Sequence, residues 1–200
     1  METPAWHLEM QRLTAAAGGL KTDTEKFYFL RHGETEHNKR RIIQTQRGVT
    51  LNDTGRSQAR AAAQILKNHD FHEIHASDLE RAWETAEIVN TECRKPIHKA
   101  PGLYERNWGD WAGQTNVGLD WGGNPNNGET LEEFTLRTLQ GFNEVLQKGE
   151  VLIVAHGGNY AVLMAAFGLS VAGPPLIRNA TPMRIVRNGG APKGWLPEVL

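Results

Sequence analysis

The chain has 200 residues, of which 39% are hydrophobic and 22% are charged, and its formal net charge is −1. This length suits one domain, and the near-neutral charge favours neither nucleic acid nor an anionic membrane surface as a partner. The single cysteine excludes an intrachain disulfide and a cysteine-based metal cluster, and it favours a reducing compartment such as the cytoplasm. No apolar run approaches the length of a transmembrane helix.

The first part of the chain divides into an appendage and the start of a domain. Residues 1–25 are predicted to be an N-terminal appendage with a helix over 6–17, and residues 26–200 a single catalytic domain. A buried strand over 26–30 leads directly into Arg31-His32-Gly33. A polar segment follows as far as Asn52, and the apolar spacing after it predicts an amphipathic helix that begins at Asp53.

The middle of the chain is predicted to hold two short strands and a long loop. Residues 73–76 form a strand, and the sequence Ser77 to Glu80 has the pattern of a capping box, which predicts that a helix begins there. Arg81 lies in the first turn of that helix, off its apolar stripe. After a short strand over 96–99, residues 100–129 form an irregular segment rich in tryptophan and glycine, and a loop of this length in a compact domain is usually functional.

The last part of the chain contains its most strand-like run. A second capping box, from Thr130 to Glu133, predicts another helix, and residues 151–155 form a buried strand that ends in His156-Gly157-Gly158. A helix is expected over 159–167, a last edge strand over 183–187, and an irregular tail from 188. Short strands that alternate with helices predict an α/β fold, a three-layer α/β/α sandwich with a mostly parallel central sheet.

This architecture would bring five polar residues together. Arg31 and His32, Arg81 and His156 each follow a predicted strand, and Glu105 lies in the loop after another. The carboxyl ends of parallel strands meet at one edge of a sheet, where open α/β sheets bind ligands. Two arginines and two histidines around one point make an electropositive pocket that suits a phosphoryl group, and a second positive charge there is unfavourable, which keeps His32 neutral.

The order and spacing of these residues resemble a known family. The chain is similar to the histidine phosphatase superfamily, the branch that includes the cofactor-dependent phosphoglycerate mutases and their phosphatase relatives, from about residue 26 to 187. The matching motifs are Arg31-His32-Gly33-Glu34-Thr35, Asn38, Gln44, Leu51 to Arg56, Ser77-Asp78-Leu79, Arg81-Ala82, Thr85-Ala86-Glu87, Glu105, Gly109, Gly113, Gly128-Glu129-Thr130 and Ala155-His156-Gly157.

The resemblance implies a role for each matching residue. His32 would be the nucleophile that becomes a phosphohistidine, Arg31 and Arg81 would grip the phosphoryl oxygens, and His156 would donate a further hydrogen bond. Glu105, for which Glu129 is a rival, would protonate the leaving oxygen and then activate water. The residues expected to bind the substrate are Asn38, Gln44, Gly157 and Arg106. Neither a metal nor another cofactor is expected.

The activity itself is expected to be that of a phosphatase acting on a small phosphorylated metabolite. The chain lacks the long insertion that covers the substrate in the mutases, although the sequence from Glu105 to Gly109 is similar to the mutase motif. Mutase-type phosphoryl transfer and an inactive module that binds phosphate esters remain as alternatives. Tyr104, Trp108, Trp111 and Trp121 either line a pocket for an apolar leaving group or pack the loop onto the domain. The substrate and the oligomeric state, a homodimer included, stay open.

Overall fold

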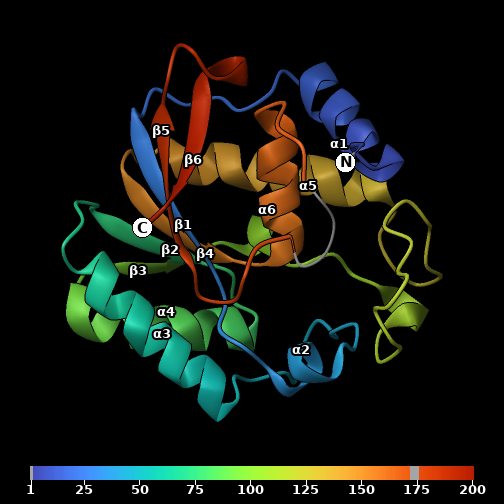
Figure 1. Cartoon of the computed structure of the whole chain (residues 1–200), viewed down its shortest axis with the longest axis horizontal. Helices are drawn as coiled ribbons and strands as arrows, with labels where there is room; N and C mark the ends of the chain where they lie inside the picture. The colour runs from blue at the N-terminus through green and yellow to red at the C-terminus, as the bar shows by residue number, and fades with distance from the viewer. Residues whose placement is uncertain (1, 172–175) are drawn as a thin grey trace.

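The computed structural model of the chain describes residues 2–171 and 176–200. The helices are α1 (Ala5–Ala16), α2 (Glu36–Arg40), α3 (Asp53–Leu66), α4 (Glu80–Cys93), α5 (Leu131–Leu146) and α6 (Gly157–Ala166), with 3₁₀ turns at Pro101–Leu103, Gly109–Trp111 and Pro192–Gly194. The strands are β1 (Lys26–Arg31), β2 (Glu73–Ala76), β3 (Ile97–Lys99), β4 (Val151–Ala155), β5 (Pro182–Arg187) and β6 (Trp195–Val199) (Figure 1).

The strands of the described chain form one sheet in the order β3-β2-β4-β1-β5-β6. β3, β2, β4 and β1 run parallel to one another, whereas β5 is antiparallel to both β1 and β6. The predicted mostly parallel sheet is therefore confirmed. The predicted position of the last strand was wrong, because the chain after residue 188 turns back and pairs with β5. β6, and not β5, therefore lies at that edge of the sheet, opposite β3.

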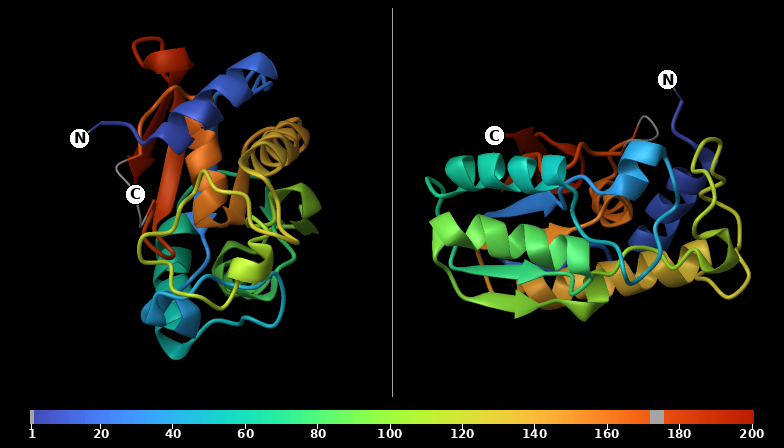
Figure 2. Two further views of the ribbon diagram at one scale, coloured as in Figure 1. Left: turned by 90° about the vertical axis from the view of Figure 1, so that its right-hand side faces the viewer. Right: turned by 90° about the horizontal axis from the view of Figure 1, so that it is seen from below.

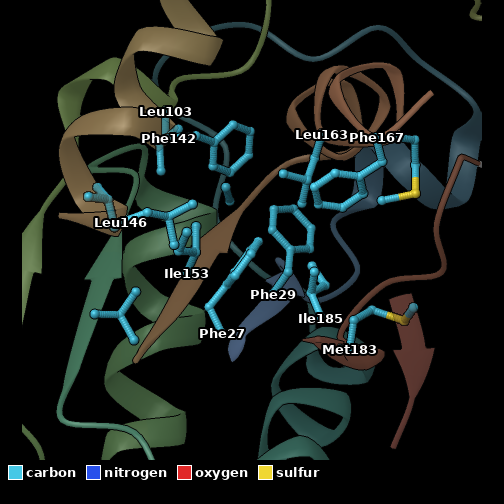
Figure 3. Close-up of a cluster of buried hydrophobic side chains, with 14 of the residues drawn as sticks. Phe27, Phe29, Leu103, Phe142, Leu146, Ile153, Leu163, Phe167, Met183 and Ile185 are labelled. Atoms are coloured by element: carbon cyan, nitrogen blue, oxygen red, sulfur yellow. The ribbon is translucent and has the colours of Figure 1, made fainter. Parts of the chain in front are cut away.

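Helices cover both faces of the sheet, which confirms the three-layer sandwich. Alternate residues of β1 point to opposite faces, as the pleat of a strand requires. Phe27 and Phe29 belong to a core with Phe142 of α5 and Leu163 of α6 (Figure 3). Tyr28 and Leu30, on the other face, belong to a core with residues of α3 and α4. Figure 2 shows α3 and α4 side by side on that face.

The segment over 1–25 carries a helix that is bound to the domain. α1 packs against α5 and α6 (Figure 1), and its Met10 and Leu13 are buried. His7, also buried, donates a hydrogen bond from Nε2 to the carbonyl of Leu169 at 2.8 Å. Gln11 donates to the same carbonyl at 3.1 Å. α1 therefore holds the chain that leaves α6.

One of the two predicted capping boxes is confirmed. Thr130 Oγ1 accepts from the Glu133 N–H at 3.1 Å, and Glu133 Oε2 accepts from the Thr130 N–H at 2.9 Å. The prediction for Ser77 was wrong, because α4 begins after Leu79. The Ser77 hydroxyl instead contacts His156, which follows the neighbouring strand β4. Within the described residues, no helix combines the length and the apolar character that crossing a membrane would need.

Candidate active site

The register of β1 and β4 places the two histidines side by side. Arg31 lies opposite Ala155 in the parallel pair, and the His32 N–H donates to the Ala155 carbonyl at 2.9 Å. The rings of His32 and His156, each the first residue after its strand, then have centroids 5.2 Å apart. The convergence expected from the topology is present, and both rings are almost fully buried.

Two glycines fix the loop that follows His32 against the start of α3. A Cβ on Gly33 would lie 2.5 Å from the Gly55 carbonyl oxygen, and a Cβ on Gly55 would lie 2.1 Å from the Glu34 carbonyl oxygen. No larger residue fits where two backbones approach so closely. Asn52 caps α3 by accepting the Gly55 N–H at 2.8 Å, so the loop after β1 is anchored to a helix terminus.

The hydrogen bond of His32 settles which ring nitrogen carries the proton. His32 Nδ1 lies 2.7 Å from the Gly33 carbonyl oxygen. A carbonyl only accepts, so Nδ1 is the protonated nitrogen, and in the neutral ring Nε2 keeps its lone pair. Burial, and after it the charges of Arg81 and Arg31, lower the pKa of His32 well below its ordinary value. The ring is therefore neutral and nucleophilic at Nε2 over the physiological pH range.

Arg81 is buried and Arg31 is half-buried, and both guanidinium groups have donors that are not used by the described part of the chain. Arg31 donates from Nη1 to the Ile177 carbonyl at 2.6 Å, and Arg81 donates from Nη1 to the Thr45 carbonyl at 3.2 Å. The Nε of each is buried, and it has no partner among the residues that the structure describes. Burial lowers the pKa of Arg81 to about 10, and it also lowers the pKa of Arg31. Both groups stay charged at neutral pH, and an anion would satisfy their remaining donors.

The ring of His156 is oriented by Ser77, the residue that was predicted to cap a helix. Its Nε2 lies 2.9 Å from Ser77 Oγ, and its Nδ1 is buried without a protein partner. Burial, followed by the charge of Arg81, lowers its pKa well below the ordinary value. Ser77 Oγ also accepts the Leu79 N–H at 3.4 Å, and it can either donate to His156 Nε2 or accept from it. When Ser77 donates, the proton of the neutral His156 ring lies on Nδ1.

Glu105 is held by two backbone N–H groups. Oε1 accepts from Arg106 at 2.9 Å, and Oε2 accepts from Gly158 in the first turn of α6 at 3.1 Å. A Cβ on Gly158 would lie 2.1 Å from Glu105 Oε1, so the carboxyl group reaches the helix only because this residue is glycine. Asn159, one residue on, donates to the Tyr104 carbonyl at 3.1 Å and fixes the loop just before Glu105.

A cavity of about 620 Å³ adjoins this cluster. Thr35 connects two of the polar residues on its lining: its Oγ1 lies 3.1 Å from both Asn38 Oδ1 and Gln44 Oε1, which share its single proton. Asn179, which the sequence gave no reason to select, donates to the His32 carbonyl at 2.9 Å and also lines the cavity. The predicted site residues among the lining are Arg31, Asn38, Gln44, Glu105 and Gly157.

Arg106 is the predicted substrate-binding residue that the structure places elsewhere. Its guanidinium is buried and donates to the carbonyls of Trp121, Gly123 and Glu129, so its donors are used to tie the long loop together. Glu129, the rival of Glu105, is also engaged: both of its oxygens pair with Arg137, at 2.7 and 2.8 Å. The carboxylate on the cavity is that of Glu105.

The comparison with protein families agrees with this geometry. Residues 27–193 match the histidine phosphatase superfamily (branch 1). The chain belongs to this superfamily, and it is a phosphatase. A glucosyl-3-phosphoglycerate phosphatase of Mycolicibacterium vanbaalenii is 32% identical over 76% of this chain and 78% of its own length. The uncharacterized phosphatase PhoE of Bacillus subtilis is 36% identical over 68% of this chain and 73% of its own.

Solved structures show the same fold. YhfR of Bacillus stearothermophilus superposes with a TM-score of 0.73 and 29% identity, over 87% of this chain and 95% of its own. A structure described as mycobacterial hydrolase 1 gives a TM-score of 0.73 and 28% identity, over 88% of this chain and 97% of that one.

Proposed function

We propose that this phosphatase hydrolyses small phosphomonoesters without a metal, through a phosphohistidine at His32. The observation that carries the proposal is the hydrogen bond from His32 Nδ1 to the Gly33 carbonyl, since it leaves the Nε2 lone pair for attack beside the buried Arg81 and the half-buried Arg31. Relatives named as phosphatases of glucosyl-3-phosphoglycerate and of adenosylcobalamin/alpha-ribazole support a small molecule as the substrate. The lone cysteine supports a cytoplasmic location.

In the first step Nε2 of His32 attacks phosphorus, and the bond from phosphorus to the ester oxygen breaks. Arg31 and Arg81 bind the phosphoryl oxygens and offset the charge that develops on them, a task for which the two guanidinium groups need no metal. Nδ1–H of His156 donates to another of these oxygens. Glu105, in its acid form, gives its proton to the departing alkoxide.

In the second step water attacks the phosphohistidine. Glu105, now a carboxylate, takes a proton from that water, the bond from phosphorus to Nε2 breaks, and inorganic phosphate leaves. His32 returns to its starting neutral form because Nδ1 has kept its proton and its bond to Gly33 throughout. One carboxylate held by two backbone N–H groups therefore serves both steps.

Access of water favours hydrolysis over transfer of the phosphoryl group to a second alcohol. Val117, on the wall of the cavity, is 64% exposed, so the cavity reaches solvent beside it. A phosphohistidine that water can reach is hydrolysed. The solvent exposure of this cavity therefore supports a phosphatase over a mutase. The complete cluster of two arginines, two histidines and a carboxylate argues against an inactive binding module.

The test is turnover of p-nitrophenyl phosphate in the presence of EDTA. We expect release of nitrophenol by the wild-type chain, and a loss of about a thousandfold or more in His32→Ala because covalent catalysis has no substitute there. Rapid quenching should trap a phosphoryl group in an acid-labile linkage on the wild-type protein and not on His32→Ala. No turnover from acidic to neutral pH, or turnover that only a divalent metal restores, would contradict the proposal.

A further inference from the structure

The cavity beside the catalytic cluster has a wall that phosphate chemistry does not require. Arg31, Glu105 and Gly157 account for the side on which the phosphoryl group reacts. Among the described residues, seven apolar ones also line the cavity, and they come from the segment after α2, from the long loop and from the segment before β5. These residues, called here the apolar wall, are Ile42, Ile43, Trp108, Val117, Leu119, Trp121 and Leu176.

The aromatic part of the apolar wall is held rigidly by its neighbours. Trp108 and Trp121 meet edge to face with centroids 4.9 Å apart. Trp6 of α1 stacks on Trp121 with ring centroids 5.3 Å apart, and Trp111 stacks on Trp108 with ring centroids 6.2 Å apart. Trp108 and Trp121 thus both pack the loop and form a wall, whereas Tyr104 and Trp111 are not on the lining of this cavity. A wall that is already formed before binding costs the substrate little ordering entropy.

Charge near the apolar wall is sparse and balanced. Besides the catalytic Arg31 and Glu105, the charged residues on the lining are Arg41 and Glu34. The Glu34 carboxylate accepts from Asn52 at 2.9 Å, a neutral partner that leaves its negative charge in place. A leaving group that carried a carboxylate would be attracted by Arg41 and repelled by Glu34, so the two charges would offset each other. An apolar leaving group would instead be stabilised by contact with apolar side chains.

We propose that the apolar wall receives the leaving group of phosphomonoesters of apolar, ring-bearing alcohols, and that such esters are the preferred substrates. The inference rests on the proposed phosphatase reaction and names its substrate class. A cavity of about 620 Å³ is large enough for a ring system beyond the phosphoryl group. The alcohol leaves with the proton from Glu105, so its ring faces the wall while its oxygen faces the carboxyl group.

The test compares phenethyl phosphate with glycerol 3-phosphate. Both release a primary alcohol, so the basicity of the leaving oxygen does not decide the result. We expect kcat/KM for the phenethyl ester to be higher by about tenfold or more, mainly through a lower KM, because a ring buried against apolar side chains adds binding shared by substrate and transition state.

Matched polar substitutions locate the preference on the apolar wall. Val117 is 64% exposed and Val199 on β6 is 68% exposed, so neither is needed to fold the protein. Val117→Asn should lower the phenethyl preference by about threefold or more. Val199→Asn, outside the cavity, should leave both the preference and the hydrolysis of glycerol 3-phosphate intact. Leu119→Asn should act in the same direction as Val117→Asn.

Two results would overturn the inference alone: equal kcat/KM for the two esters, or a preference that both wall variants keep in full. If the wild-type chain hydrolysed none of the three esters, p-nitrophenyl phosphate included, that result would overturn the proposed function and this inference with it.

Discussion

Gly158 makes a specific prediction at the scale of single residues. Because a Cβ there would collide with Glu105 Oε1, Gly158→Ala should displace the acid while His32 and the arginines stay in place. We expect kcat/KM for phenethyl phosphate, which reports the first step, to fall by about tenfold to a hundredfold. kcat/KM for p-nitrophenyl phosphate should fall much less, since nitrophenolate leaves without a proton donor. Steady-state kinetics on both esters measure this difference.

The matched control is Gly189→Ala. A Cβ at Gly189 would meet nothing within 4 Å, so that variant should keep both rates. A Cβ at Gly158 would also approach Phe134 Cζ, at 2.9 Å, so the melting temperature must be recorded alongside. Equal losses on the two esters would show that the variant damages the fold and not the position of the acid.

Some residues of the site could be predicted from their positions after strands, whereas others make contacts that only the folded structure shows. His32 and His156 were predicted because each directly follows a strand, and Arg81 because it opens the helix after another strand; strand order alone brings such positions together. Ser77 has the pattern of a helix cap, and only the parallel pairing of β2 with β4 shows that it faces His156 instead. Arg106 was misjudged because a guanidinium beside a catalytic residue looks the same in sequence whether it binds substrate or, as here, three backbone carbonyls.

At the scale of elements, α1 is predicted to act on the apolar wall through one stacked pair. Trp6→Ala removes the ring that lies 5.3 Å from Trp121 with an interplanar angle of 29°. We expect a lower melting temperature, by about 4 °C or more, because an aromatic packing contact is lost. KM for phenethyl phosphate should rise, while kcat for glycerol 3-phosphate should stay close to that of the wild type.

Leu8→Ala is the control for this helix, since Leu8 belongs to α1 and is 52% exposed. Trp6→Phe should restore part of the lost affinity because a smaller ring still stacks. A change in KM that Leu8→Ala reproduces would show that α1 contributes general stability only.

Helices and strands could be predicted where the apolar pattern was strong. The predictions failed where pairing with a distant strand determined the structure. β4 follows from an unbroken apolar run and was predicted at its observed bounds, and the start of α5 follows from its capping box. β6 was missed because Pro197 and the preceding glycines indicate irregular chain. An edge strand tolerates proline, since one side of its backbone has no partner in the sheet, and β6 is such a strand.

At the scale of the whole molecule, buried neutral histidines connect stability to pH. His7, His32 and His156 are each almost fully buried, and in each case burial is the main cause that lowers the pKa below its ordinary value of about 6.5. The folded chain therefore holds fewer protons than the unfolded chain when the pH is below that value. Their contribution to stability is complete above about pH 6.5 and is lost as the pH falls from there toward the folded-state pKa values.

We expect the melting temperature to fall by several degrees between about pH 7 and about pH 5.5, measured by thermal unfolding in buffers of equal ionic strength. His7 allows the effect to be separated from catalysis, because it lies on α1 and donates to the Leu169 carbonyl. His7→Gln keeps a donor but cannot take up a proton, so its melting temperature should depend less steeply on pH while its phosphatase activity is retained. A melting temperature that rises toward pH 5.5, or an equally steep dependence in His7→Gln, would show that buried histidines do not control the acid stability of this fold.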